Sequence, residues 1–213
     1  MDRRSFLAAS AGVSLTVGLA GCSALFDASM PDELADVDPD RQLPVPTRGD
    51  GAVTVDVYED PGCRACQEFQ ADVMPDLEAG PIDRDEITYR HYDFVVEAAE
   101  ESVAMANAAR AVQDETRIED DPNGAFFAYK AAVMNADDWS DDGLVDLAAA
   151  VDADPDAVSS ALADGTYYPT LAADWERGDD AGVDSTPTVV VDGETVDEPL
   201  DPDAVVSHVA DAS

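Results

Sequence analysis

A pair of cysteines lies at the point where a strand pattern changes into a helix pattern, and few folds place two cysteines there. Residues 52–58 alternate apolar and polar side chains and are rich in valine, which predicts a strand. A break of Glu, Asp, Pro and Gly leads into Cys-Arg-Ala-Cys at 63–66. Apolar residues then recur at helical spacing from Cys66 to Leu77, and Pro75 predicts a kink. The cysteines are therefore predicted on the first turn of a helix that follows a strand.

The rest of the chain predicts a second strand, a long helical block and a return to β-structure. Residues 86–94 are typical of the strand, and residues from about 97 to 180 carry helical periodicity with N-cap signals at Ser140 and Asp154. A hairpin with an Asp-Gly turn is predicted over 188–196, and a last helix closes the chain. This order of elements, β, α, β, helical block, β-hairpin and α, predicts an α/β fold.

The N-terminus has the features of an export signal. Arg3 and Arg4 resemble a twin-arginine signal. The weakly apolar run that follows is too short to cross a bilayer of about 30 Å as a helix. It ends in Leu-Ala-Gly-Cys, which is similar to a lipobox, the motif in which the cysteine carries a lipid. We expect a signal peptide over residues 1–21 and a lipid on Cys22 that anchors the protein to the outer face of the cytoplasmic membrane.

The segment between this signal and the first strand is predicted to be a tether. Residues 22–49 contain four prolines and many aspartates, and they show no sustained period. Such a composition is typical of a solvated, disordered linker. The folded domain is therefore expected to occupy residues 50–213.

The charge of the chain excludes two classes of partner. There are 11 Lys and Arg against 48 Asp and Glu, a net charge of −37. Nucleic-acid binding needs a basic surface, and electrostatic attraction to anionic lipids needs a polybasic segment. Only Lys130 is a lysine. This composition resembles that of haloarchaeal proteins, whose exposed charges are screened by multimolar salt.

Three features together resemble the thioredoxin superfamily, and in particular its DsbA branch. They are the Cys-x-x-Cys that opens a helix after a strand, the helical block, and Ser-Thr-Pro-Thr at 185–188 before a valine-rich strand. The resemblance covers roughly residues 50–212. It implies a thioredoxin-like fold in which a helical insertion, about 97–180, separates an N-terminal βαβ part from a C-terminal ββα part. It also implies a thiol–disulfide oxidoreductase with no cofactor beyond the redox-active disulfide Cys63–Cys66.

The chemistry of disulfide exchange suggests a role for each thiol. The attacking species is a thiolate, whereas a free thiol has a pKa of about 8.5. Cys63 is predicted as the nucleophile because unpaired N–H groups and the positive dipole end at a helix N-terminus favour an anion. Cys66, one turn further in, is predicted as the more buried resolving thiol. Arg64 adds a cation that would tune the thiolate, while Glu59 and Asp60 oppose it.

Pro187 is the second predicted component of the site. The resemblance places a cis proline beside the cysteine pair. A cis Thr186–Pro187 bond would leave the backbone of Thr186 free to pair with an extended substrate segment. The alternative is an ordinary trans proline at the start of an edge strand.

The chain departs from the family in two places. Val57 stands six residues before the first cysteine, where many members carry a buried carboxylate that helps to move a proton. Asp56 should face the other side of the strand and Glu59 lies nearby, so the proton-transfer residue stays unassigned. The dipeptide at 64–65 lacks the Pro-His of strongly oxidising members, so the direction of electron flow also stays open.

Two simpler interpretations of the cysteines are less favoured. A structural Cys63–Cys66 disulfide would close too short a loop to gain much stability. A metal site would need four ligands, and the mature chain offers two thiols with His91 and His208. Both histidines are expected to be surface or packing residues, and no metal is predicted.

The predicted function is therefore a lipid-anchored thiol–disulfide oxidoreductase that acts on exported proteins, with a redox partner in the membrane. One alternative is a thiol reductase fed by a membrane electron donor, for example in cytochrome maturation. Another is a non-enzymatic surface lipoprotein that uses the same fold to bind a partner.

Overall fold

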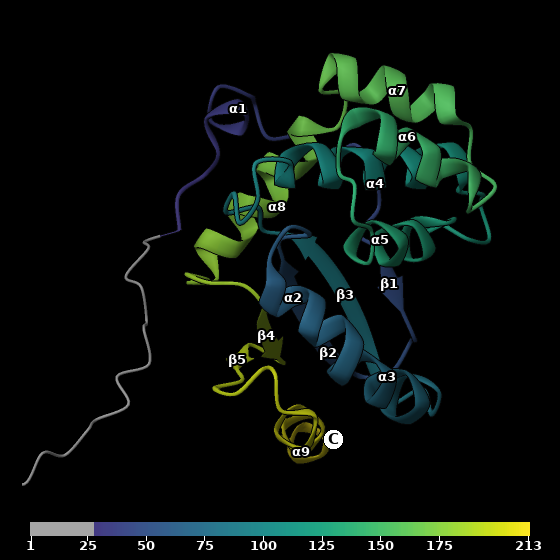
Figure 1. Ribbon diagram of the computed structural model, residues 1–213. Helices are drawn as coiled ribbons and strands as arrows, with labels where there is room; N and C mark the ends of the chain where they lie inside the picture. The colour runs from purple at the N-terminus through teal and green to yellow at the C-terminus, as the bar shows by residue number, and fades with distance from the viewer. Residues whose placement is uncertain (1–27) are drawn as a thin grey trace, which may run out of the picture.

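The computed structural model describes residues 28–213, which are built around a five-stranded mixed sheet (Figure 1). The strand order is β1-β3-β2-β4-β5. Strands β2 and β3 are parallel, and the other neighbouring pairs are antiparallel. The strands are β1 (Thr47–Arg48), β2 (Val53–Glu59), β3 (Ile87–Asp93), β4 (Thr188–Val191) and β5 (Glu194–Thr195). The predicted α/β class and the predicted order of elements along the chain are confirmed from β2 onward, and β1 is an additional strand.

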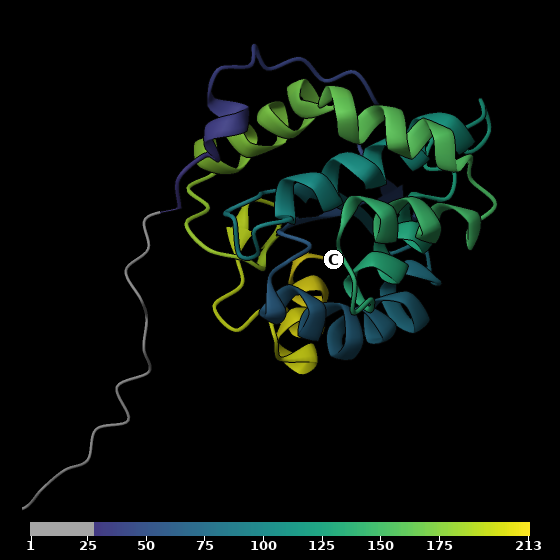
Figure 2. The ribbon, with the colours of Figure 1, turned by 45° about the horizontal axis from the view of Figure 1, so that its top comes forward.

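Helices cover both faces of this sheet. The redox helix comprises α2 (Arg64–Glu68), a π-helical turn η1 (Phe69–Val73), α3 (Met74–Leu77) and a second π-helical turn η2 (Glu78–Ile82). The other helices are α1 (Asp32–Ala35), α4 (Ser102–Thr116), α5 (Phe126–Met134), α6 (Asp141–Ala149), α7 (Pro155–Asp164), α8 (Tyr168–Asp180) and α9 (Pro202–Ala212). Helix α9 lies beside the redox helix (Figure 2), and both pack on the valines of β2. Helices α4 to α7 share a separate apolar core.

The alternation of β2 decides which side chains reach which face. Val53, Val55 and Val57 are buried against the redox helix and α9. Asp56 and Tyr58 point to the opposite face, where Asp56 pairs with Arg90. The prediction that Asp56 faces away from the cysteines is thus in agreement with the structure.

The redox helix is interrupted before Pro75, as predicted. The π-helical turn over Phe69–Val73 separates α2 from α3. Proline lacks the N–H of a regular helix, and its ring crowds the carbonyl four residues earlier, so the normal hydrogen bond cannot form there. Phe69 and Val73 nevertheless stay fully buried among the strand valines.

Local capping signals identified several element ends correctly. The hydroxyl of Ser140 accepts from the N–H of Gly143 at 3.2 Å. The carboxylate of Asp154 accepts from the N–H of Asp156 at 3.0 Å. At the hairpin turn, Asp192 and Gly193 both have positive φ, 46° and 90°, as a tight two-residue turn requires.

Two helices differ from their predicted extents. Helix α4 begins at Ser102 instead of near residue 97, because the preceding loop is held by hydrogen bonds to Asp60. Helix α8 has 13 residues where only a short helix was expected. Its buried side includes Thr170 and Asp174. Because these polar residues interrupt the apolar stripe, the periodicity of the sequence underestimates the length of this helix.

The predicted tether is wrong for residues 28–49, which pack on the domain. Leu34 of α1 is fully buried against Val95, Val103 and Leu171. Arg41 forms an ion pair with the buried Asp174. The short β1 then pairs with β3. A four-residue helix and a two-residue strand are too short to show a period, so the sequence carried no signal for them.

The predicted signal peptide, Arg3, Arg4 and the lipidated Cys22 lie outside the described residues. Among residues 28–213, no helix is both long enough and apolar enough to span a membrane.

We expect Leu34→Ala to lower the free energy of unfolding by about 2 to 4 kcal/mol, because it removes a buried leucine from the contact between α1 and α8. Chemical denaturation measures this directly. The neighbouring exposed Glu33 is the control, and Glu33→Ala should change stability by less than about 0.5 kcal/mol. If both substitutions changed stability by equally small amounts, α1 would not be packed on the domain and the prediction of a tether would stand.

Candidate active site

Cys63 and Cys66 lie at the predicted junction between β2 and the redox helix. Cys63 is the N-cap residue of α2, with an extended backbone (φ −76°, ψ 123°). Its carbonyl accepts from the N–H of Gln67 at 3.0 Å. The side chain of Cys63 is partly exposed, whereas that of Cys66 is fully buried, and both thiols are free. One sulfur can thus meet another molecule while the second stands behind it.

The pKa values of the two thiols are shifted in opposite directions. The pKa of Cys63 is lowered to about 6, and the largest cause is the hydrogen bond with the Cys66 thiol, which outweighs the effect of burial. Further hydrogen bonds from Thr186 and from backbone groups of Cys66 and Ala65 lower this pKa as well. Burial, above all, raises the pKa of Cys66 well above its ordinary value, and the negative charge of Glu59 adds to this. At neutral pH the pair therefore holds one thiolate, at Cys63, and one thiol.

The Thr186–Pro187 peptide bond is cis, as predicted. The carbonyl oxygen of Thr186 lies 3.5 Å from Cys63 Sγ, and the Cys63 thiol donates to it when protonated. This contact follows from the sheet, because β4 pairs with β2 and places Thr188 opposite Tyr58. Residues more than a hundred positions apart in the sequence thus form one site.

A cavity of about 510 Å³ adjoins Ala65, which lies between the two cysteines, and the cis proline. Leu200, in its wall, is one of only two large apolar side chains that are exposed within residues 28–213. The cavity is lined by Ala65, Thr186, Pro187, Glu198, Pro199, Leu200 and Asp201. An apolar contact beside an exposed thiolate suits a segment of unfolded protein.

Arg64, the predicted tuning residue, is exposed at the start of α2. The influences that lower the pKa of Cys63 are hydrogen bonds, first from Cys66 and then from Thr186. An exposed cation acts weakly in concentrated salt. A tuning role for Arg64 stays a prediction.

Asp60, which the sequence did not single out as a structural residue, fixes the loop before Cys63. Its buried carboxylate accepts four hydrogen bonds, from the N–H groups of Gly62, Val96 and Ala98 and from the hydroxyl of Ser102. A side chain at Gly62 would collide with Ser102, since its Cβ would lie 2.5 Å from that hydroxyl oxygen. This contact explains why a glycine directly precedes Cys63.

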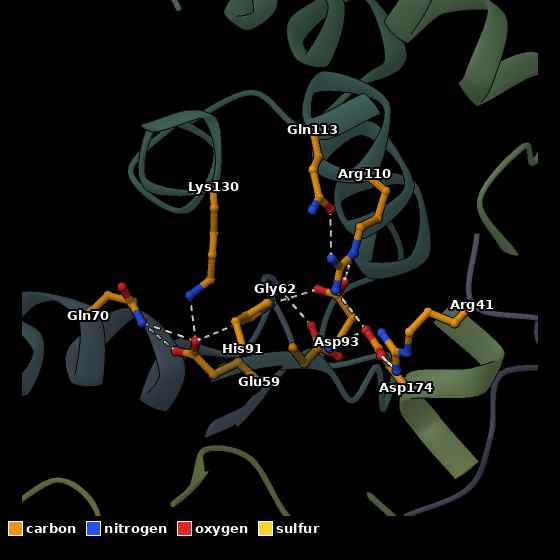
Figure 3. A network of polar contacts seen from close by, with 11 residues as sticks. Arg41, Glu59, Gly62, Gln70, His91, Asp93, Arg110, Gln113, Lys130 and Asp174 are labelled. Carbon is orange, nitrogen blue, oxygen red and sulfur yellow. Dashed lines mark hydrogen bonds and ion pairs between the residues drawn. The ribbon is translucent and has the colours of Figure 1, made fainter. Parts of the chain in front are cut away.

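Glu59 is the buried carboxylate for which the sequence offered no assignment. It is fully buried, forms an ion pair with Lys130 of α5 and accepts hydrogen bonds from Gln70 (Figure 3). Burial alone would raise the pKa of Glu59, but the charge of Lys130 and the hydrogen bond with His91 hold it down at about 2. Lys130 is the only lysine of an acidic chain and lies on an otherwise apolar helix. This placement was the signal that could have predicted a buried ion pair with a carboxylate.

His91 is buried and links Glu59 to a second ionic cluster (Figure 3). Its ring packs against Phe126, as a packing residue would, with 5.2 Å between centroids. Its two nitrogens, however, face the carboxylates of Glu59 and Asp93. The cluster continues through Arg110, Asp174 and Arg41.

The four candidate metal ligands do not come together. Both ring nitrogens of His91 contact carboxylates, and Nδ1 of His208 contacts the carbonyl of Ala204 at 3.1 Å. Residues 28–213 contain no group of three or more His, Cys, Asp or Glu side chains arranged to hold a metal ion.

A family model described as Thioredoxin matches residues 48–211. The chain belongs to this thioredoxin family. The match begins at the end of β1 and covers both cysteines, the insertion and the cis proline. No curated protein matches the chain significantly.

Solved structures share the fold. BdbD from Bacillus subtilis is 21% identical with a TM-score of 0.70, and the match covers 82% of this chain and 98% of BdbD. DsbA from Chlamydia trachomatis is 20% identical with a TM-score of 0.70, covering 79% and 91%. MdbA, a thiol-disulfide oxidoreductase from Actinomyces oris, is 21% identical with a TM-score of 0.63, covering 78% and 86%. The thioredoxin-like fold of DsbA-type proteins, with its helical insertion, is thus confirmed.

We expect the thiolate absorbance of Cys63 to titrate near pH 6 and to change little with KCl above about 1 M, since hydrogen bonds are not screened as exposed charges are. As the pH falls through this value, the thiolate and the rate of its alkylation should be lost together. Arg64→Ala is the control and should leave the titration almost unchanged. A strong salt dependence, or a large shift in that variant, would assign control to Arg64.

Proposed function

We propose that this chain is a thiol–disulfide oxidoreductase that acts on exported proteins, with Cys63 as the nucleophile and Cys66 as the resolving thiol. The observation that carries the proposal is the opposite displacement of the two pKa values, with a reactive sulfur that is partly exposed and a resolving sulfur that is buried. A purely structural disulfide would need neither. The cofactor is the Cys63–Cys66 disulfide itself.

The exchange involves two successive sulfur–sulfur substitutions. A substrate thiolate attacks Cys63 Sγ of the oxidised pair, the Cys63–Cys66 bond breaks, and Cys66 leaves with the electron pair and takes up a proton. A second substrate thiolate then attacks the substrate sulfur of the mixed disulfide and releases Cys63 as a thiolate. The substrate loses two electrons and the pair gains them. The low pKa makes Cys63 a good leaving group in this direction.

Substrate recognition is proposed to use the Thr186 backbone and the cavity beside it. An extended segment of unfolded protein would pair with the main chain of Thr186, which keeps the substrate sulfur in line with Cys63. A neighbouring apolar side chain of the substrate would contact Leu200. These contacts are not sequence-specific, as a broad substrate range requires.

The cellular setting is proposed from the N-terminal sequence. Arg3 and Arg4 would direct export, and a lipid on Cys22 would hold the protein at the outer face of the cytoplasmic membrane. Exported proteins with thiols or disulfides would be its substrates, and a redox protein of the membrane would regenerate the pair.

Cys66→Ala should accumulate a mixed disulfide with substrate proteins, because Cys63 can still attack but no resolving thiol is present. The trapped species are seen on non-reducing gels and identified by mass spectrometry. Cys63→Ala is the matched control and should trap nothing. If the Cys66→Ala protein also forms no adduct, the chain is a binding lipoprotein and not an oxidoreductase.

The reduction potential should decide between oxidant and reductant, and we expect a value closer to about −120 mV than to about −270 mV. The low pKa of Cys63 stabilises the reduced state, which favours oxidation of substrates. Reduction takes up two protons below the pKa of Cys63 and one above it. As the pH rises, the reduction potential should therefore fall by about 60 mV per pH unit below pH 6 and by about 30 mV per pH unit above pH 6. A potential near that of thioredoxin would favour the alternative, a membrane-fed reductase.

A further inference from the structure

The ring of His91 bridges two buried carboxylates. Its side chain is 1% exposed, Nδ1 lies 3.2 Å from Oε2 of Glu59, and Nε2 lies 3.0 Å from Oδ1 of Asp93. A neutral imidazole carries one N–H, so one of these contacts would place a nitrogen lone pair against a carboxylate oxygen. Only a ring with both N–H protons makes two hydrogen bonds to two ionised carboxylates.

The buried charges around His91 are compatible with a second proton on its ring. Three buried carboxylates are ion-paired with three cations, of which Arg41 is partly exposed: Glu59, Asp93 and Asp174 with Lys130, Arg110 and Arg41. Asp60, next to Glu59, is buried with uncharged donors only. A doubly protonated His91 would bring the sum over these groups to zero, and a net buried charge is costly to hold away from water.

Asp174 is the competing site for the extra proton, since burial raises its pKa. Both of its oxygens are already occupied by donors, Oδ1 by Arg41 and Oδ2 by Arg110 and the N–H of Asp93. All of these partners are donors, so a proton on this carboxylate would find no acceptor among them and would remove the charge that two arginines bind. A second proton on His91 instead completes a hydrogen bond to a carboxylate.

We propose that His91 is a buried imidazolium that, by offsetting the charge of Glu59, controls how readily the resolving thiol Cys66 ionises. Glu59 lies against the helix that carries Cys66, because its carboxylate accepts hydrogen bonds from Gln70, one turn further along that helix. The negative charge of Glu59 opposes the Cys66 thiolate, and Lys130 and His91 both compensate that charge. His91 is thus a positioning residue that acts on the second sulfur and not on the first. This role rests on the proposed function of the cysteine pair.

The step affected is the attack of Cys66 on a mixed disulfide at Cys63. Cys66 loses its proton, its sulfur bonds to Cys63 Sγ, and the bond between Cys63 and the substrate breaks. The electron pair leaves with the substrate sulfur, which ends as a thiol with the proton that Cys66 gave up. The substrate is reduced and the cysteine pair is oxidised. Attack by Cys63 on a disulfide precedes this step and does not need Cys66 ionised.

The kinetic test compares His91→Gln with the intact chain, reacted with a small aromatic disulfide in stopped flow. Formation of the mixed disulfide at Cys63 should be unchanged. Resolution by Cys66 should be about tenfold slower at pH 7 and should recover about one pH unit higher, as a one-unit rise in the pKa of Cys66 demands. His208→Gln, on the partly exposed side of α9, is the control and should alter neither step.

A double-variant cycle distinguishes electrostatic control from a general loss of packing. In a Glu59→Gln background the charge that His91 offsets is gone, so adding His91→Gln should then slow resolution less than twofold. A tenfold loss in both backgrounds would overturn the proposal. Failure of the proposed function would be visible separately, as absence of the first step in every variant.

The charge state can be read directly from nitrogen NMR. The chain has two histidines, so the His208→Gln protein shows a single imidazole. We expect both ring nitrogens of His91 to carry protons at neutral pH, with a coupling from each ring N–H. One unprotonated ring nitrogen in this protein would refute the imidazolium whatever the kinetics show.

Discussion

Two adjacent buried carboxylates at the end of β2, Glu59 and Asp60, hold the redox helix to the rest of the molecule. Asp60 binds the loop before Cys63 to the loop that opens α4. Glu59 binds Lys130 of α5. Separating these elements would leave buried charges without partners, and an unpaired buried carboxylate costs several kcal/mol. The orientation of the cysteine pair therefore depends on the helical insertion as much as on the thioredoxin-like core.

The interior and the surface of this protein follow different electrostatic rules. The chain carries a net charge of −37, and dissolved salt screens the charges that are exposed. The buried acids near the cysteines are each matched by a cation or by backbone donors, as with Lys130 on Glu59 and Arg110 on Asp93. Salt does not reach such pairs, so the pKa values of the site can be set independently of the medium. This separation allows reactive sulfur chemistry on a highly acidic fold.

The predictions succeeded where the physical cause is local. The strand before the cysteines, the interruption at Pro75 and the cap at Ser140 depend on neighbouring residues only, and all are present. The resemblance correctly implied the cis bond at Pro187. The predictions failed where long-range pairing decides. Residues 28–49 were expected to be a tether because short elements lack a period, and α8 was underestimated because its buried Asp174 is satisfied by arginines distant in the sequence.

Local patterns in the sequence were enough to predict the order of elements, the position of two thiols at the start of a helix and the family resemblance, because spacing, capping and periodicity act within a few residues. The acid that stands near the buried thiol, in contrast, could be identified only from the three-dimensional arrangement. Glu59 is four residues before Cys63, but its partners Lys130 and His91 come from α5 and β3. Burial and pairing depend on all the elements that surround a group at once, and no local pattern contains that information.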